Sequence, residues 1–403
     1  MENNWKEVYL GDISDVQTGP FGSQLKNEQY IKGGTPVVTV EHIKDFRITD
    51  FDYPSITDED KDRLAKYLMK TDDILFTRVG SVDLSAYVSE KQNGWMFSSR
   101  MLRVRTNEEV HSKFLSYYFQ QRSFRDYILN ISVGATMPSI NTSILKSLII
   151  SYPPLPEQKA IASVLSSLDD KIDLLHQQNQ TLEALAETLF RQWFIERCPE
   201  PVEGEAKEDW EDCTIGDLAI HSKLSVHPNR NPDTLYHHYS IPAFDANKKP
   251  VVEFGKEIQS NKYKVEENSI LFSKLNPHKD KRVWLIQDSV EEHAICSTEL
   301  QVVKPKDNDY LYFIYGWLTN SIYYNEIASG VGGTSGSHQR IEPKAIFSAP
   351  CVKIKKDIIL QYNLHAKPLF KKQLENSKQI QTLTQMRDTL LPKLMSGEVR
   401  VKI

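Results

Sequence analysis

Residues 153–197 read PPLPEQKAIASVLSSLDDKIDLLHQQNQTLEALAETLFRQWFIER and decide the fold. Residues spaced alternately four and three apart form a seam along this stretch, at Ile161, Leu165, Leu168, Ile172, Leu175, Asn179, Leu182, Ala186, Leu189 and Trp193. An unbroken heptad spacing of this length predicts a long helix in a coiled coil. The prolines of residues 153–156 mark its start, because proline disfavours helix in the preceding residue and suits a first turn. Such a helix in mid-chain requires a partner.

The C-terminal segment, residues 355–403, is the predicted partner helix. Shifting the first seam by 201 residues gives a weaker version of it, at Tyr362, Ala366, Leu369, Gln373, Asn376, Ile380, Leu383, Arg387, Leu390 and Leu394. Residues 153–204 carry four basic and nine acidic side chains, whereas residues 355–403 carry ten basic and four acidic ones. The two helices are therefore electrostatically complementary. Pro368 is expected to kink the second helix or to start its regular part.

An antiparallel pairing of these helices would set Ile161 near Leu394 and Asn179 opposite Asn376. A facing polar pair in an apolar seam fixes the register of a coiled coil at some cost in stability. The alternative is that Asn376 points to solvent.

A repeat extends beyond the helices. Short words recur about 200 residues apart: NWKE at 4–7 as DWED at 209–212, DILFTR at 73–78 as SILFSK at 269–274, and LRV at 102–104 as LQV at 300–302. Self-similarity of this period indicates a duplicated unit, each copy a globular domain followed by a long helix. We expect the two copies to be related by a pseudo-twofold axis.

Each globular part is predicted to be α+β, because short strands bounded by turn residues accompany helical spacing at residues 111–129 and 310–329. A polar segment broken by proline and glycine separates the copies. The predicted organisation is a first globular domain at 1–152, a central helix at 153–197, a linker at 198–208, a second globular domain at 209–354 and a C-terminal helix at 355–403.

The composition indicates an ordinary globular protein: 403 residues, 40% hydrophobic, 26% charged, with a formal charge of −5. No apolar run approaches the roughly 18 residues of a membrane span, and the N-terminus lacks signal-peptide character, so we expect a cytoplasmic protein without a membrane partner. The four cysteines are scattered, which favours free thiols over disulfides or zinc. His237 and His238 would point to opposite faces of a strand without a third ligand, so no metal site is expected.

The order domain, helix, domain, helix, together with PPLPEQ at 153–158 and LLPKLMSGE at 390–398, resembles the specificity (S) subunit of Type I restriction-modification systems. The resemblance implies two target recognition domains, each of which reads one half of a bipartite, asymmetric DNA site, with the helical pair as spacer. It also implies a non-catalytic subunit that docks two adenine-N6 methyltransferase (M) subunits and restriction (R) subunits. S-adenosylmethionine and ATP would bind to those partners, and this chain would need no cofactor.

In the first domain, three loops are candidates for contact with double-stranded DNA. Glycines in residues 18–26 would let the backbone approach phosphates. Arg78 is the candidate for a bidentate contact with guanine. The candidate contact residues of this domain are Ser23, Gln24, Lys26, Arg78, Ser81, Thr136, Ser139 and Asn141. Each loop could also be a plain surface turn.

In the second domain, residues 272–282 and 334–340 are the corresponding loops. Gln339 could pair with adenine, and Arg340 with guanine or phosphate. The candidate contact residues are Lys274, Asn276, His278, Lys281, Ser335, Ser337, His338, Gln339 and Arg340.

Near the end of the central helix, Phe190, Trp193 and Phe194 are expected to be exposed and to form part of a surface for the methyltransferase subunits. On this interpretation, Phe194→Ala would weaken that binding and leave the chain folded.

The sequence leaves two other classes of protein as alternatives to a specificity subunit. A coiled-coil scaffold without DNA binding would explain the helices and the duplication, but not the basic, Gly/Ser-rich loops at equivalent positions. A standalone nuclease or methyltransferase is disfavoured, because there is no GxxxxGK[ST] loop. The segment NPHK at 276–279 begins like an amino-methyltransferase motif but lacks the aromatic residues that hold a flipped base.

Overall fold

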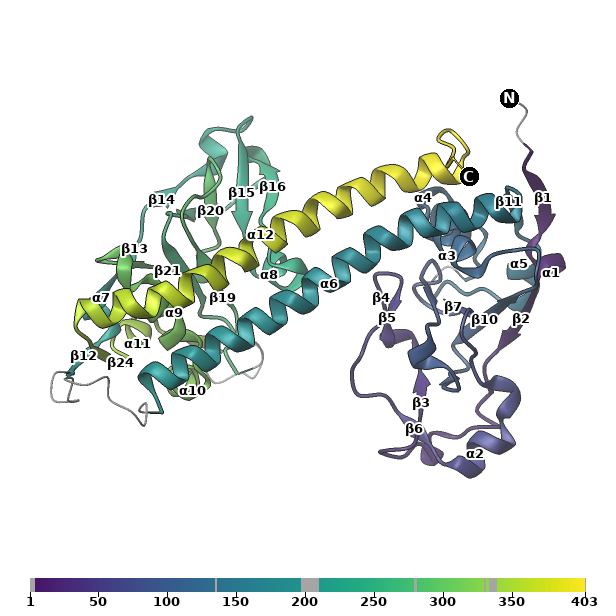
Figure 1. Ribbon diagram of the computed structural model, residues 1–403, viewed down its shortest axis with the longest axis horizontal. Helices are drawn as coiled ribbons and strands as arrows, with labels where there is room; N and C mark the ends of the chain where they lie inside the picture. Colours follow the sequence, from purple (N-terminus) through teal and green to yellow (C-terminus); the bar gives the residue numbers. More distant parts are fainter. Residues whose placement is uncertain are drawn as a thin grey trace. The chain divides into compact units, whose positions relative to one another are not determined.

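The computed structural model describes residues 4–134, 136–196, 210–278, 281–329, 331–332 and 339–402. The chain forms two compact units, unit 1 (Met1–Leu175 with Lys378–Ile403) and unit 2 (His176–Ser377) (Figure 1). Unit 1 is thus built from two segments that unit 2 separates along the chain. The predicted linker, residues 198–208, lies outside the described residues.

Unit 1 is organised around an antiparallel sheet in the strand order β2-β10-β7-β8. A separate antiparallel pair joins β1 to β11. The strands of this unit are β1 (Lys6–Tyr9), β2 (Ser14–Thr18), β3 (Thr35–Val38), β4 (Ile43–Lys44), β5 (Arg47–Ile48), β6 (Ser55–Ile56), β7 (Ile74–Thr77), β8 (Ser85–Tyr87), β9 (Met96–Phe97), β10 (Met101–Thr106) and β11 (Ile149–Tyr152). Its short helices are α1 (Leu10–Ile13), α2 (Asp58–Arg63), α3 (Ser112–Gln120), α4 (Arg122–Ile131) and α5 (Thr142–Lys146).

Unit 2 repeats this plan with the sheet β13-β21-β18-β19 and the pair β12-β24. Its strands are β12 (Glu211–Thr214), β13 (Ala219–Ser222), β14 (Ser225–Val226), β15 (Leu235–Tyr239), β16 (Val251–Phe254), β17 (Lys262–Lys264), β18 (Ser269–Ser273), β19 (Val283–Ile286), β20 (Ala294–Cys296), β21 (Leu300–Pro305), β22 (Val331–Gly332), β23 (Arg340–Ile341) and β24 (Pro350–Lys353). Its short helices are α7 (Ile215–Leu218), α8 (Ile241–Asn247), α9 (Leu311–Thr319), α10 (Ser321–Ser329) and α11 (Pro343–Phe347).

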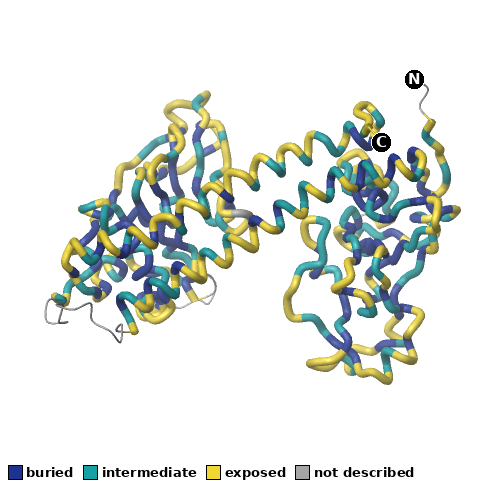
Figure 2. The backbone as a smooth tube through the Cα atoms, viewed as in Figure 1, coloured by how far each residue is buried: buried dark blue, intermediate teal, exposed yellow. Residues whose placement is uncertain are grey.

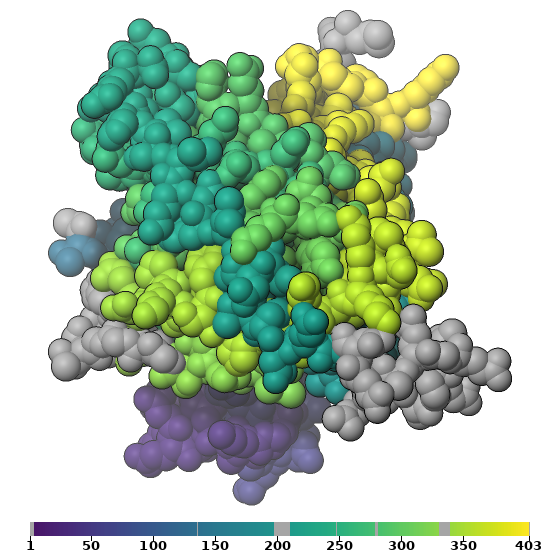
Figure 3. Space-filling model, turned by 90° about the vertical axis from the view of Figure 1, so that its left-hand side faces the viewer, coloured from purple at the N-terminus to yellow at the C-terminus, as the bar shows by residue number. Residues whose placement is uncertain are grey.

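A second sheet, β14-β17-β20-β15-β16, belongs to unit 2. Its parallel pairing of β15 with β20 brings distant segments together, and Figure 3 shows the teal and green parts of this unit side by side. The α+β class of both units is confirmed. The helical regions expected at 111–129 and 310–329 are each two helices, because the chain turns at Gln121 and Asn320.

The register of the central strands aligns the two copies residue by residue. Met101 pairs with Thr77 in unit 1, as Leu300 pairs with Ser273 in unit 2. Leu102 therefore corresponds to Gln301, and the sequence match of LRV with LQV is wrong by one residue.

Both faces of each central sheet are covered, so strand residues alternate between two cores. In β7, Ile74 and Phe76 join the core under the helices, whereas Leu75 joins the core beneath a three-stranded sheet, β6-β3-β9. In β18, Ile270 and Phe272 alternate with Leu271 in the same way. Figure 2 shows the buried residues gathered in the interior of each unit.

Two long helices, α6 (Leu155–Phe194) and α12 (Lys356–Met395), each contribute to both units. In unit 1, Ile161 and Leu165 share a buried core with Leu394, as an antiparallel pairing requires. In unit 2, Asn376 is fully buried and its Nδ2 donates to Oδ1 of Asn179 at 2.9 Å. The predicted antiparallel register is confirmed. The helix α12 runs through Pro368 without interruption, which corrects the expectation that its regular part starts there.

Candidate functional site

Two of the predicted loops of unit 1 are joined through the backbone at the end of β7. The amide of Ile140 donates to the carbonyl of Arg78 at 3.0 Å, and the amide of Gly80 donates to that of Pro138 at 2.9 Å. On the other side, the amide of Arg78 donates to the carbonyl of Arg100 at 2.8 Å. The residue Arg78 is therefore held between two neighbouring loops.

The side chain of Arg78 connects the third predicted loop. Its Nη1 lies 3.4 Å from Oγ1 of Thr18 and 3.3 Å from the carbonyl of Ser99. Its guanidinium carbon lies 5.6 Å from the centroid of the exposed Phe21 ring, within cation–π range. A Cβ added to Gly19 would meet the carbonyl oxygen of Ser98 at 2.2 Å, so this approach requires glycine. The three loops form one site around Arg78.

Among the other candidates of unit 1, the exposed ones are Ser23, Lys26, Ser81, Thr136 and Asn141. Three candidate side chains form hydrogen bonds within the unit. Oε1 of Gln24 accepts from the Tyr67 hydroxyl at 2.7 Å, and the Ser139 hydroxyl donates to the Val133 carbonyl at 3.1 Å. Oδ1 of Asn141 accepts from the Ile144 amide at 2.8 Å and caps α5. Their contact with DNA stays a prediction.

Unit 2 assembles an equivalent site at the end of β18. The amide of Ile341 donates to the carbonyl of Lys274 at 2.9 Å, and the amide of Asn276 donates to that of Gln339 at 2.9 Å. These bonds bring Lys274, Asn276, Gln339 and Arg340 together. The candidates Ser335, Ser337 and His338 lie outside the described residues.

An acidic residue lies among the cations of unit 2. The Nε and Nη2 atoms of Arg340 donate to the two carboxylate oxygens of Glu299 at 3.1 Å each, and the Lys274 ammonium lies 3.8 Å from the same carboxylate. The hydrogen bonds from Arg340 to Glu299 raise the pKa of Arg340 above its ordinary value. His278 is exposed. Lys281 instead donates to the carbonyl of Thr319 at the end of α9.

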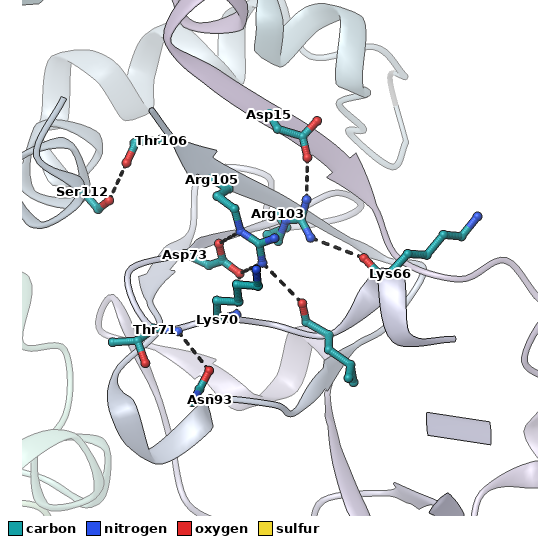
Figure 4. A network of polar contacts seen from close by, with 11 residues as sticks. Asp15, Lys66, Lys70, Thr71, Asp73, Asn93, Arg103, Arg105, Thr106 and Ser112 are labelled. Carbon is teal, nitrogen blue, oxygen red and sulfur yellow. Dashed lines mark hydrogen bonds and ion pairs between the residues drawn. The ribbon is translucent and has the colours of Figure 1, made fainter. Parts of the chain in front are cut away.

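Two other arginines of unit 1, Arg103 and Arg105, form ion pairs within the unit. The Nε and Nη2 atoms of Arg105 donate to the carboxylate of Asp73 at 2.7 Å each, and Arg103 donates to Asp15 at 2.5 Å (Figure 4). Burial lowers the pKa of Arg103, whereas the hydrogen bond to Asp73 raises that of Arg105. Because these charges are already neutralised inside the unit, they are poor candidates for phosphate contact.

Sequence reasoning missed Arg100, Phe21 and Glu299 as parts of these sites. Phe21 stood in a predicted loop but was not chosen, because its packing on Arg78 is not visible in sequence. Arg100 and Glu299 directly follow two similar pairs of hydroxyl residues, Ser98-Ser99 and Ser297-Thr298, and that further repeat was the available signal.

The expectation that Phe190, Trp193 and Phe194 are all exposed is wrong for the two phenylalanines. Phe190 and Phe194 are 1% and 5% exposed, and Trp193 is half-buried against the same core. The Phe194 ring packs 4.9 Å from both Phe313 and Tyr362. Phe190 and Phe194 close the core of unit 2 against α9 and α12, so these two side chains are unavailable to a partner.

The first of the two motifs that carried the family resemblance, PPLPEQ at 153–158, has a structural role in unit 1. Gln158 is fully buried; its Oε1 accepts from the His111 amide at 2.8 Å and its Nε2 donates to the Pro153 carbonyl at 2.9 Å. Glu157 is 3% exposed and pairs with Arg400, whose Nη2 lies 2.6 Å from Oε2. The start of α6 is thereby tied to the segment that follows α12.

Across the part of the chain that the structure describes, no group of three or more His, Cys, Asp or Glu side chains could hold a metal ion. His238 instead pairs through Nδ1 with Glu253 at 2.6 Å. Within the same residues, no helix is long and apolar enough to span a membrane.

Comparisons with known proteins agree with the resemblance found in the sequence. Residues 2–184 match the model of the Type I restriction modification DNA specificity domain. The chain is 28% identical to the Type I restriction enzyme MjaIX specificity subunit of Methanocaldococcus jannaschii, with 99% of this chain and 94% of that protein covered. It is 23% identical to the HindI specificity subunit of Haemophilus influenzae, with 98% and 100% covered. The fold is similar to the crystal structure of a Type I S subunit from M. genitalium (TM-score 0.63, 16% identity, 99% and 97% covered).

Proposed function

We propose that this chain belongs to the specificity-subunit family of Type I restriction-modification systems and that each of its units reads one half of a bipartite DNA site. The observation that carries this proposal is that the same site occurs in both units. In each unit, the loop after β7 or β18 is held by equivalent backbone hydrogen bonds and lined by basic and polar side chains. Because the side chains differ between the units, the two half-sites differ and the whole site is asymmetric.

The exposed groups of each site suit recognition of duplex DNA. The guanidinium of Arg78 can present paired donors to O6 and N7 of guanine. Exposed Lys26 and Arg100 can contact phosphates, which position the protein without reading sequence. Replacement Arg78→Ala is expected to weaken binding by about 1–3 kcal/mol and to relax the half-site of unit 1. Binding that weakens equally for all sequences would identify Arg78 as a phosphate contact instead.

The helical pair is proposed to set the spacer between the half-sites. A protein that reads two half-sites must present them about one helical turn apart or a multiple of it. Matched insertions of seven residues in both α6 and α12 preserve the heptad seam. We expect them to change the spacer and to leave both half-site sequences unchanged. Altered half-sites with an unchanged spacer would contradict this role for the helices.

The subunit is proposed to be non-catalytic and to act within an assembly. Two methyltransferase subunits would supply adenine methylation with S-adenosylmethionine, and restriction subunits would use ATP. This chain would supply the sequence choice and needs no cofactor in this proposal. Methylation of DNA by the purified chain with added S-adenosylmethionine would overturn that division of roles.

The decisive experiment expresses this chain with a cognate methyltransferase subunit in an unmethylated host and maps N6-methyladenine across the genome. A split, asymmetric motif that appears only when both subunits are present is the expected result. If the complex forms but no new methylation appears, and if the purified complex binds no duplex in a salt-dependent manner, the chain is a protein scaffold.

A further inference from the structure

The two sites share one backbone frame, which makes their side chains comparable position by position. The amides of Arg78 and Lys274 donate to the carbonyls of Arg100 and Glu299 at 2.8 and 3.0 Å. The carbonyls of Arg78 and Lys274 accept from Ile140 and Ile341 at 3.0 and 2.9 Å. Arg100 therefore corresponds to Glu299.

A third position completes this frame. In unit 1 a β-bridge pairs Val79 with Ser139, and in unit 2 a bridge pairs Leu275 with Arg340. The following residues, Gly80 and Asn276, both have positive φ, at +86° and +48°. Ser139 therefore corresponds to Arg340, and the three equivalent pairs are Arg78 with Lys274, Arg100 with Glu299, and Ser139 with Arg340.

The charges at these three positions differ between the units. Unit 1 carries two cations, Arg78 and Arg100, and the Arg78 guanidinium donates to the uncharged Thr18 hydroxyl and Ser99 carbonyl. Unit 2 carries two cations around one carboxylate, and both cations lie within 4 Å of it. The third position is a serine in unit 1 and a cation in unit 2. Unit 2 therefore presents an arginine whose orientation is fixed by a neighbouring acid.

We propose that Glu299 is a positioning residue that sets the sequence preference of unit 2 by holding Arg340 in one orientation toward the base edges. This inference rests on the proposed function. The carboxylate binds Nε and Nη2 of Arg340, which leaves the Nη1 donors and one Nη2 hydrogen free for a base or phosphate. An arginine held in this way discriminates between bases better than a freely rotating one, because a misplaced acceptor cannot recruit it.

A carboxylate at a DNA-facing position has a second effect. It repels phosphates and cancels part of the attraction of Lys274 and Arg340, which lowers affinity for unrelated sequences. Glu299 thus raises discrimination between half-site sequences and also lowers the affinity for unrelated DNA. Replacing a residue that only supported the fold would change the affinity for the specific site and the affinity for unrelated DNA in the same direction.

The test uses the complex of the full chain with its methyltransferase subunit and the variant Glu299→Gln, which removes the charge and keeps the shape. Binding is measured over a range of salt concentrations, on the mapped site, on the site with the unit 2 half altered, and on an unrelated duplex. We expect binding of the unrelated duplex to strengthen several-fold, with a salt slope steeper by about one phosphate contact. We also expect discrimination at the unit 2 half to fall about tenfold.

Two further variants isolate the arginine's orientation from the change in charge. Glu292→Gln makes the same charge change in the turn before β20, where the carboxylate is 89% exposed, and is expected to leave discrimination intact. Arg340→Lys keeps the positive charge but cannot form the forked contact. It is expected to lose discrimination about as much as Glu299→Gln, without the gain in non-specific binding.

The methylation motif supplies an independent readout. Glu299→Gln should relax the unit 2 half and leave the unit 1 half unchanged. The inference is overturned if this variant retains the full motif, or if it weakens binding to all duplexes equally. Failure of the unaltered complex to bind any duplex would instead overturn the proposed function.

Discussion

The same helix pair is stabilised by different chemistry in the two units. In unit 1, Asp169 of α6 accepts from Arg387 of α12 at 2.9 Å and from the Tyr117 hydroxyl at 2.6 Å. In unit 2, α6 and α12 meet through aromatic rings, with Phe190 and Tyr362 both at most 1% exposed. The topology of a helix pair packed on a sheet domain therefore does not dictate which interactions stabilise it.

This difference predicts which substitutions lower the stability of each unit. An aromatic core depends on side-chain volume, because a cavity costs both the transfer free energy and the lost contacts. Partly buried ion pairs depend on both partners being present, because a charge left alone is penalised. Substitutions that remove volume should act mainly in unit 2, and substitutions that remove charge mainly in unit 1.

The largest expected effect is that of Phe190→Ala. The ring fills the space above Gly316, where an added Cβ would lie 2.2 Å from it, so truncation leaves a cavity against α9. We expect unit 2 to lose about 3–5 kcal/mol of unfolding free energy. Hydrogen exchange resolved by peptide should show the loss in unit 2. Leu185→Ala, at a position 50% exposed on the same helix, is the matched control and should have little effect. Equal losses for both would contradict the comparison.

Next in size is Glu157→Gln, which removes the charge that Arg400 faces. Because hydrogen bonds to charged groups contribute about 1.5–3 kcal/mol, unit 1 should lose that amount while unit 2 is unchanged. Peptides from the start of α6 and from residues 396–402 should exchange faster. Arg400→Gln in the Glu157→Gln background should add little, since the pair is already broken. A full additional loss would show that the two residues act independently.

The smallest expected effect concerns the polar exception within unit 2. Asn376→Leu alone should cost about 1 kcal/mol, because it removes the donor to Oδ1 of Asn179. The double variant Asn179→Leu with Asn376→Leu should recover that loss or exceed it, since an apolar pair suits the seam. Denaturant unfolding of the unaltered protein, the single variants Asn179→Leu and Asn376→Leu, and the double variant gives the coupling energy. An additive double variant would mean that the 2.9 Å contact contributes no stability.

Heptad spacing made the helices predictable, because a seam is a local property of the sequence. It placed α6 and α12, their antiparallel register and the pair Asn179–Asn376. The repeated words likewise indicated loops that the structure joins around Arg78 and Lys274. Local spacing does not reveal what packs on the flank of a helix, so Phe190 and Phe194 appeared to be surface residues until α9 was in place. For the same reason, the pairing of Arg340 with Glu299, distant in sequence, was not foreseen.

Unit 1 draws its core from both ends of the chain, and this has a consequence for synthesis on the ribosome. Unit 2 is continuous in sequence, so all its parts have emerged once residue 377 has left the exit tunnel. Unit 1 must wait for residues 378–402, and until then Ile161 and Leu165 lack the Leu394 against which they pack. A chain that stalls or terminates in between carries a finished second unit and an unfinished first one. Its exposed apolar seam would mark the incomplete product for chaperones and proteases.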